Sequence, residues 1–252
     1  MKLFFRKYGS GDALIIMHGL FGTSDNWNTL AKKYAEHFTT YVIDLRNHGQ
    51  SPHSEEWNYE VMADDVAELL KDEDVPRAHI MGHSMGGKVA MFMADKYGPS
   101  INKLVVADIA PKNYPPHHDL ILAALNGLDL DAITTRKEAE AYMAANIEEP
   151  GVRQFLLKSL YWNDSKLAWR FNLPVITHQI ENVGQELTGS IYFEGPTLFI
   201  RGEKSNYITD NDIDLILEHF PNSHLATIAN AGHWLHAENP QEYLKVTLEF
   251  LL

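Results

Sequence analysis

The chain has 252 residues, 45% of them hydrophobic, which is enough for one well-buried core. It contains no cysteine, and this excludes disulfides, thiolate metal sites, iron–sulfur clusters and a cysteine nucleophile. The formal net charge of −13 disfavours nucleic acid or an anionic membrane surface as a partner. If the protein has a nucleophile, it is another type of residue.

Neither end of the chain carries a targeting signal that we can identify. Leu3–Phe5 is the only apolar run near the N-terminus and is too short for a signal peptide, and no later run is long enough for a membrane span. We therefore expect a cytoplasmic protein that does not act in a membrane. The sequence does not predict an oligomeric state.

Short apolar runs alternate with longer amphipathic stretches, a pattern typical of a parallel sheet with helices on both faces. Leu3–Tyr8 is expected to form an antiparallel edge strand. The strands expected after it are Leu14–His18, Tyr41–Asp44, His79–Gly82, Leu104–Asp108, Thr197–Arg201 and Leu225–Ile228. The helices expected between them are Trp27–Glu36, Val61–Lys71 and Gly86–Tyr97.

The stretch of residues 111–195 has a different pattern. It holds helical periodicity and no run that reads as a buried strand, with helices expected at Leu120–Leu128, Thr135–Asn146 and Val152–Leu160. We expect it to be a helical cap inserted between two late strands, with residues 1–110 and 196–252 forming the core. Some of its aromatic residues are candidates for the roof of an apolar pocket, for packing of the cap against the core, or for both, namely Tyr161, Trp162, Trp169 and Phe171.

One motif carries chemistry. Gly82-His83-Ser84-Met85-Gly86 stands where an expected strand ends and an expected helix begins, which is the context of the G-x-S-x-G nucleophile elbow. Glycines flank the serine because the turn is too tight for neighbouring side chains, and the turn raises the serine hydroxyl above the sheet at a helix N-terminus. An ordinary glycine-rich turn is the alternative, and the strand and helix on either side favour the elbow.

Four segments together resemble the α/β-hydrolase superfamily over the whole chain: His18–Gly22, Asp44–Ser51, Gly82–Gly87 and Ala231–Trp234. The segments Asp44–Gly49 and Asp108–Pro111 are similar in particular to bacterial esterases of the YbfF type, which are related to mammalian abhydrolase-domain 11 proteins. The resemblance implies an α/β-hydrolase fold, with a mostly parallel central sheet flanked by helices, and a serine esterase activity. We expect the polar residues of Asp44–Ser51 to fix a loop rather than to react.

A serine hydroxyl is a weak nucleophile and needs a base, which in turn needs a carboxylate. In this fold the chain order is serine, acid, histidine. Beyond the last expected strand lie His233 and His236. His233, in a short loop before Trp234, is the expected base, and Trp234 is a candidate for the substrate pocket. His236 stands close to the start of the last helix, where a structural role is the simpler interpretation.

The acid is less plain. Most members of the superfamily carry it in a Gly-x-x-Asp pattern after the strand that follows the insertion, but here Gly202 is followed at the same spacing by Ser205. Asp108 ends the preceding expected strand and can reach the same base, and the YbfF-type resemblance implies this aspartate, with Ser205 bonded into the network. A turn-capping role is the alternative for Asp108. The other candidate acids are Glu203, Asp210 and Asp212.

An oxyanion hole needs two backbone N–H donors. We expect them at Leu20 and Met85, with Phe21 as the alternative donor if the loop is rotated by one residue. Phe21 is otherwise a candidate for the acyl pocket, and His83 for supporting the site. His18 is expected to bond the loop.

These residues predict a serine carboxylic-ester hydrolase for short to medium acyl esters, with a small-molecule substrate and no cofactor. Acyl-CoA thioester hydrolysis and a non-catalytic ligand-binding role are the alternatives. We expect no metal site, because the adjacent His117, His118 and Asp119 would point apart. No phosphate-binding glycine motif follows a strand.

Overall fold

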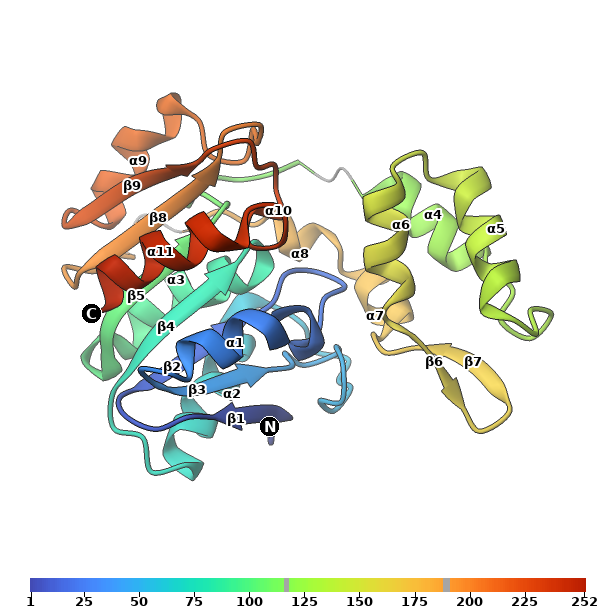
Figure 1. Ribbon diagram of the computed structural model, residues 1–252, viewed down its shortest axis with the longest axis horizontal. Coiled ribbons are helices and arrows are strands. Elements are labelled where there is room, and N and C mark those ends of the chain that lie inside the picture. The colour runs from blue at the N-terminus through green and yellow to red at the C-terminus, as the bar shows by residue number, and fades with distance from the viewer. Residues whose placement is uncertain (116–117, 188–190) are drawn as a thin grey trace.

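The computed structural model describes residues 1–115, 118–187 and 191–252 (Figure 1). Within these residues a seven-stranded sheet has the order β1-β3-β2-β4-β5-β8-β9, in which β1 is antiparallel to β3 and the other neighbours are parallel. The strands are β1 (Phe5–Tyr8), β2 (Ala13–Met17), β3 (Thr39–Ile43), β4 (Ala78–His83), β5 (Ile101–Ala107), β8 (Thr197–Gly202) and β9 (Ser223–Ile228). The predicted fold class is confirmed. His18, Asp44 and Asp108, expected as strand ends, lie just beyond their strands.

Helices cover both faces of the sheet. The core helices are α1 (Asn28–Tyr34), α2 (Tyr59–Asp72), α3 (Met85–Tyr97), α9 (Ile213–His219), α10 (Leu235–Glu238) and α11 (Pro240–Leu251), with 3-10 turns at Ser24–Trp27, Gly98–Ser100 and Asp210–Asp212. In Figure 1, α1 and α11 lie in front of the sheet, and α2 and α3 lie behind it. Within the described residues, no helix combines the length and the apolar composition that a membrane span requires.

The strands are apolar almost throughout because alternate side chains enter opposite cores. In β2, Ile15 and Met17 join the core that includes residues of α2 and α3. Leu14 and Ile16 join the core that includes residues of α1 and α11. A parallel sheet buried on both faces follows from this pattern.

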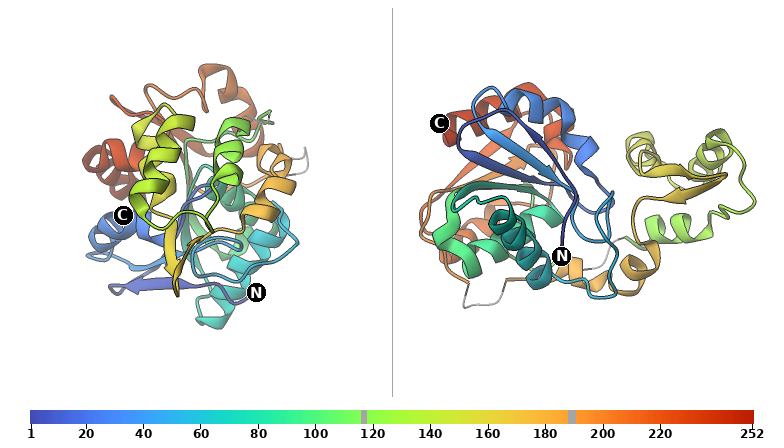
Figure 2. Two further views of the ribbon diagram at one scale, coloured as in Figure 1. Left: turned by 90° about the vertical axis from the view of Figure 1, so that its right-hand side faces the viewer. Right: turned by 90° about the horizontal axis from the view of Figure 1, so that it is seen from below.

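The chain between β5 and β8, for which we keep the name cap, stands at one end of the core (Figures 1 and 2). Its elements are α4 (Asp119–Gly127), α5 (Arg136–Asn146), α6 (Pro150–Leu157), β6 (Leu160–Asn163), β7 (Lys166–Trp169), α7 (Leu173–His178) and α8 (Glu181–Gly184). In Figure 1, α4, α5 and α6 lie above the β6–β7 hairpin.

The β6–β7 hairpin corrects the expectation of a cap without strands. The helix expected at Val152–Leu160 ends at Leu157, and Leu160 begins β6. Leu160 and Leu167 enter a small core of the cap, while their neighbours face outward, which is the period of a strand. Asp164 has a φ of 54° in the two-residue turn, a conformation that aspartate tolerates. The turn between two alternating runs was the signal available in the sequence.

Lys88 of α3 joins the cap to the core. Its ammonium group donates 2.7 Å hydrogen bonds to the carbonyls of Lys112 and Gln185, at the beginning and the end of the cap. The same two segments also pair directly, since the amide of Tyr114 donates to the carbonyl of Gly184 at 2.8 Å. Burial lowers the pKa of Lys88 to about 7. The side chain therefore holds together the two connections on which the cap rests.

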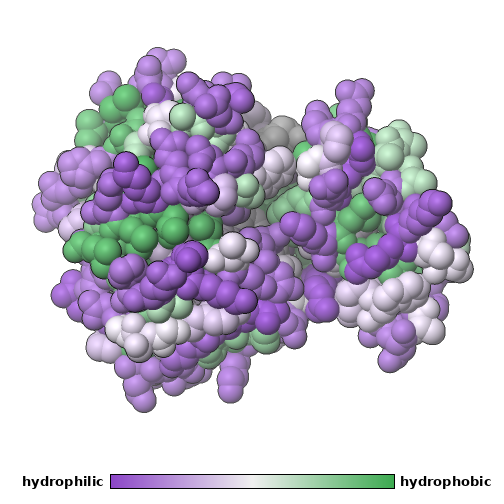
Figure 3. All heavy atoms as spheres, viewed as in Figure 1, coloured by the Kyte–Doolittle hydropathy of each residue, from purple (hydrophilic) through white to green (hydrophobic). Residues whose placement is uncertain are grey.

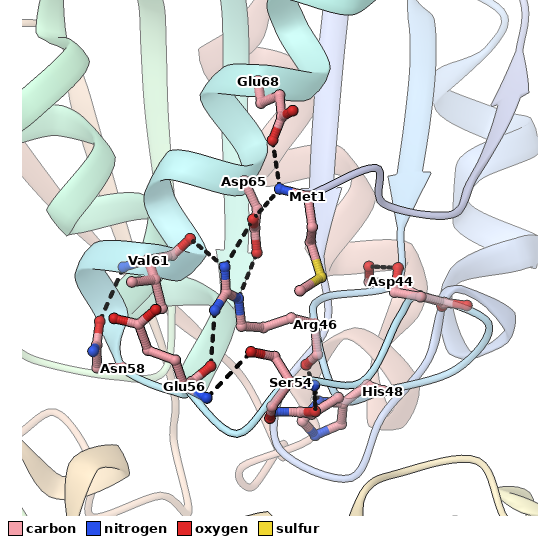
Figure 4. A network of polar contacts seen from close by, with 12 residues as sticks. Met1, Asp44, Arg46, His48, Ser54, Glu56, Asn58, Val61, Asp65 and Glu68 are labelled. Carbon is pink, nitrogen blue, oxygen red and sulfur yellow. Dashed lines mark hydrogen bonds and ion pairs between the residues drawn. The ribbon is translucent and has the colours of Figure 1, made fainter.

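A buried ion pair fixes the loop after β3 (Figure 4). The guanidinium of Arg46 donates to both carboxylate oxygens of Asp65 on α2, at 2.6 and 2.9 Å, and to the carbonyl of Glu56 at 2.8 Å. Asp44 accepts from the amides of Ser24 and Gln50, at 2.6 and 2.8 Å. These contacts fix the course of the loop, since every polar group named here bonds within the protein.

We expect Asp65→Asn to lower the free energy of unfolding by about 3 kcal/mol, because it leaves the Arg46 charge buried without its partner. Urea unfolding measures the change. The matched control is Asp131→Asn, which removes an ion pair with Lys166 whose side chains are 79% and 69% exposed. That change should cost less than about 0.5 kcal/mol, and equal losses in the two variants would contradict the interpretation.

Candidate active site

Ser84 lies in a strained turn between β4 and α3. Its φ is 52°, in the left-handed region that a serine rarely occupies. A Cβ atom on Gly82 would lie 2.0 Å from the carbonyl oxygen of Gly86, and a Cβ atom on Gly86 would lie 2.6 Å from that of His18. Both glycines are therefore required by close backbone contacts, and the turn has the geometry of a nucleophile elbow.

Three side chains from separate loops meet at this turn. The Ser84 hydroxyl lies 3.0 Å from Nε2 of His233, and Nδ1 of the same imidazole lies 2.7 Å from Oδ2 of Asp108. Asp108 follows β5 with a φ of 52°, and His233 follows β9. The structure thus brings together the serine, histidine and aspartate that the sequence analysis selected, although they lie far apart in the chain.

The carboxylate of Asp108 is completely buried and fully bonded. Besides the imidazole, it accepts from the Ser205 hydroxyl and from the amide of Gly202, the latter at 3.1 Å. Three donors compensate for the loss of hydration and fix the direction of both carboxylate oxygens. Ser205, which stands where most of the superfamily has its acid, therefore bonds to this acid.

The other candidate acids have partners elsewhere. Glu203 accepts from the amide of Asn230 at 2.7 Å, and Asp210 forms an ion pair with Arg201 at 2.7 Å. Asp212 forms an ion pair with Lys112, also at 2.7 Å. None of these contacts involves His233, whereas Asp108 lies within hydrogen-bonding distance of it, so the geometry favours Asp108 over all three.

His83, inside the elbow motif, supports the loop of His233. Its Nε2 donates to the carbonyl of His233 at 2.7 Å, and its ring lies against those of His233 and His236. Burial holds the pKa of His83 well below its usual value, which keeps the ring neutral. His236 stacks on Trp27 with ring centroids 4.2 Å apart, and this position fits the structural role expected for it.

The sequence analysis missed Tyr207. Its ring stacks on the imidazole of His233 with centroids 3.9 Å apart and planes 17° from parallel. Its amide donates to the Ser205 hydroxyl at 3.3 Å, and its carbonyl accepts from Tyr114 at 2.5 Å. The only signal for this role in the sequence was an aromatic residue two positions after Ser205. The stacking itself arises because two loops that are distant in the sequence meet in the fold.

Two histidines hold the loop after β2 through hydrogen bonds. The amide of Phe21 donates to Nε2 of His48 at 3.2 Å, which opposes the alternative of Phe21 as the donor. His18 donates to the carbonyl of Gly19 at 2.8 Å and accepts from the amide of Leu45 at 3.1 Å, so it bonds the loop as expected. Burial lowers the pKa of His18 to about 4 and that of His48 to about 3. Both rings are neutral near pH 7.

A cavity of about 250 Å³ opens above Ser84 and His233. Leu20, Phe21 and Trp234 line it from the core. The cap contributes Ile121, Val152, Phe155 and Leu156. In the same region Figure 3 shows a surface hollowed between the core and the cap. We call this space the large cavity.

The sequence analysis considered four aromatic residues of the cap as a roof for the pocket, and the large cavity does not have this roof. Among the described residues that line it, Tyr161, Trp162, Trp169 and Phe171 do not occur. Trp169 stacks on Phe171, and Phe171 packs against Phe21 at 5.0 Å between centroids, so these rings support the cavity wall from behind. Trp169 and Phe171 therefore serve packing, the second of the two roles considered, whereas the side chain of Trp162 is exposed.

Among the described residues, no group of three or more histidine, aspartate or glutamate side chains is arranged to hold a metal ion. His117, part of the metal motif considered in the sequence, lies outside the described residues.

The sequence and the fold match those of known proteins. A family model described as alpha/beta hydrolase fold matches residues 12–141. The esterase YbfF of Escherichia coli is 39% identical over 240 residues, which cover 94% of this chain and 92% of that protein. The chain therefore belongs to the alpha/beta hydrolase family and, within it, groups with the YbfF-type proteins.

Two further relatives extend the comparison. The sn-1-specific diacylglycerol lipase ABHD11 of Mus musculus is 34% identical over 95% of this chain and 80% of that protein. Among solved structures, a marine microorganism esterase is 44% identical and superposes with a TM-score of 0.96 over 99% of both chains.

Proposed function

We propose that the protein is a serine carboxylic-ester hydrolase that acts on small-molecule esters of short to medium acyl groups. The observation that carries this proposal is the unbroken chain of hydrogen bonds from the Ser84 hydroxyl through His233 to Asp108, at the floor of an apolar cavity. The names of the relatives, esterase and diacylglycerol lipase, support the same reaction class.

In the first half of the reaction, Nε2 of His233 takes the Ser84 proton while the serine oxygen attacks the ester carbonyl carbon. The carbonyl oxygen becomes an oxyanion, which the amides of Leu20 and Met85 stabilise. Met85 is the first residue of α3, so its amide has no acceptor within the helix. The alcohol then leaves with the proton from His233, and the acyl group stays on Ser84.

In the second half, His233 takes a proton from a water molecule while the water oxygen attacks the acyl carbon. The Ser84–acyl bond then breaks, the serine oxygen receives the proton from His233, and the acid leaves. Asp108 acts through His233: it accepts the Nδ1 proton, which fixes the tautomer with a free Nε2, and it stabilises the imidazolium. We propose that residues 111–195 act as a cap that selects substrates by size, and that Phe21 and Trp234 contact them.

The test compares 4-nitrophenyl acetate, butyrate and octanoate with acetyl-CoA, using the wild type and Ser84→Ala. We expect ester hydrolysis that falls at least about 10⁴-fold in Ser84→Ala. We expect acetyl-CoA to react more slowly, because its anionic leaving group approaches a chain of net charge −13. Wild-type rates in Ser84→Ala would contradict the serine mechanism, and faster cleavage of acetyl-CoA would favour a thioesterase.

We expect Ser205→Ala to lower kcat about tenfold, because the Asp108 carboxylate loses one of its charge-assisted hydrogen bonds. Ser205→Thr keeps the hydroxyl and should retain most of the activity. The rates of both variants on 4-nitrophenyl acetate provide the measurement. Equal losses in the two would show that the hydroxyl is not the group that matters.

A further inference from the structure

A second, much smaller cavity lies against Ser84. Its volume is about 20 Å³, and its walls include Tyr59, Met85, Ile109, Ile180 and Val183. We call it the small cavity. Leu20, Ser84 and Tyr207 line both spaces, so the serine stands between them. The two cavities differ in one respect that bears on the reaction: His233 lines the large cavity and does not line the small one.

The proposed reaction fixes where the two halves of an ester can lie. In the tetrahedral intermediate the carbonyl carbon bears the serine oxygen, the oxyanion, the alcohol oxygen and the acyl chain. The alcohol oxygen must lie near Nε2 of His233 to receive its proton, and the oxyanion must face the amides of Leu20 and Met85. The acyl chain takes the remaining direction, away from His233.

We infer that the small cavity holds the acyl chain and the large cavity holds the alcohol part of the substrate. The inference rests on the proposed function and makes its substrate class specific. A group the size of a water molecule needs about 10–15 Å³ of such space. The small cavity, at about 20 Å³, therefore accepts the methyl group of an acetyl ester and little more. The large cavity, at about 250 Å³, accepts a bulky apolar alcohol.

The walls of the small cavity are held in place. The hydroxyl of Tyr59 donates to the carbonyl of Val183 at 2.7 Å, which ties α2 to α8 of the cap. The ring of Tyr59 stacks on Phe92 at 5.3 Å between centroids, and Ile109 packs closely against Gly87. A longer acyl chain would have to displace packed side chains rather than water, which makes chain length costly at this end.

The assignment of the acyl chain and the alcohol to different cavities has a chemical consequence. When the first alcohol leaves, the large cavity is free while the acyl group remains on Ser84. A second alcohol bound there can attack the acyl carbon: its proton passes to His233, its oxygen bonds to the carbon, the Ser84–acyl bond breaks, and the serine oxygen receives the proton. The enzyme should therefore transfer short acyl groups to apolar alcohols as well as to water.

The test is a matrix of esters in which the acyl chain runs from acetyl to octanoyl and the alcohol is ethanol or 2-phenylethanol. With the wild type, we expect kcat/KM to fall at least about tenfold between propionyl and hexanoyl for either alcohol. Exchanging ethyl for 2-phenylethyl should not lower kcat/KM. Added 2-phenylethanol should also divert acetyl groups from water into 2-phenylethyl acetate. A preference for octanoyl over acetyl in both alcohol series would overturn the inference.

Two valine-to-alanine variants offer a matched pair. Val183 lines only the small cavity and Val152 only the large one, and both side chains are half-buried. Val183→Ala keeps the carbonyl that Tyr59 bonds, and it should move the preferred acyl group to a longer chain. Val152→Ala should leave the preferred acyl length as it is. A shift in acyl preference with Val152→Ala instead would overturn the inference.

The two proposals can fail separately. Ester hydrolysis that depends on Ser84 but favours long acyl chains contradicts the assignment of the acyl chain to the small cavity. It does not contradict the proposal that the protein is a serine hydrolase. If the protein hydrolyses no ester of the matrix, both the proposed function and the assignment of the two cavities are contradicted.

Discussion

Replacement of Asp108 by Asn should lower kcat about 10⁴-fold. Nδ1 of His233 lies 2.7 Å from Oδ2 of Asp108, and an asparagine amide that donates to Nδ1 would leave the proton on Nε2. That imidazole cannot take a proton from Ser84. The measurement is steady-state hydrolysis of 4-nitrophenyl acetate, with circular dichroism to verify that the variant is folded.

The control variants are Glu203→Gln and Asp210→Asn, which alter the other carboxylates close to the site. Their partners are the amide of Asn230 and the side chain of Arg201, so we expect kcat to change by less than about threefold. Near-full activity in Asp108→Asn, or a large loss in a control variant, would show that the acid is assigned to the wrong residue.

Lowering the pH from 7 to 5 should destabilise the fold by several kcal/mol. Burial lowers the pKa of His18 to about 4 and those of His48 and His236 to about 3, and it lowers the pKa of His83 well below its usual value. In the unfolded chain each ring takes up a proton near pH 6.5. Between that pH and the folded pKa values, the unfolded state binds more protons than the folded state, so stability falls as the pH falls.

The slope is up to about 1.4 kcal/mol per pH unit for each ring, and up to about 5.6 kcal/mol per pH unit for the four rings together. Urea unfolding at pH 7, 6 and 5 measures it. His48→Asn removes one of the four rings and should therefore reduce the slope by about 1.4 kcal/mol per pH unit. The exposed His53 offers the control His53→Asn, which should keep the wild-type dependence on pH. A midpoint that does not change between pH 7 and 5 would contradict the account.

The sequence predicts the sheet well because most of the parallel strands are buried on both faces and contain apolar runs, such as Leu14–Met17. The β6–β7 hairpin is harder to recognise, since each strand has four residues and buries only one of them, Leu160 in β6 and Leu167 in β7. Its turn also lacks the glycine that signals most two-residue hairpins.

At the site, Ser84 and His233 are predictable because each stands in a local motif. The choice of Asp108 as the acid relied on the resemblance to a group of esterases, because three other carboxylates remained possible. The stacking of Tyr207 on His233, the donation from His83 to the His233 carbonyl and the small cavity all depend on how separate loops approach each other. No spacing in the sequence encodes these contacts.

The central claim is that Ser84 forms the acyl-enzyme, and a fluorophosphonate probe tests it most directly. Intact-protein mass spectrometry of the wild type should show one phosphonyl adduct per chain, peptide mapping should locate it at Ser84, and the loss of ester hydrolysis should follow the labelled fraction. Ser84→Ala should take up no adduct. A labelled protein that retains its activity, or an adduct on another residue, would contradict the account.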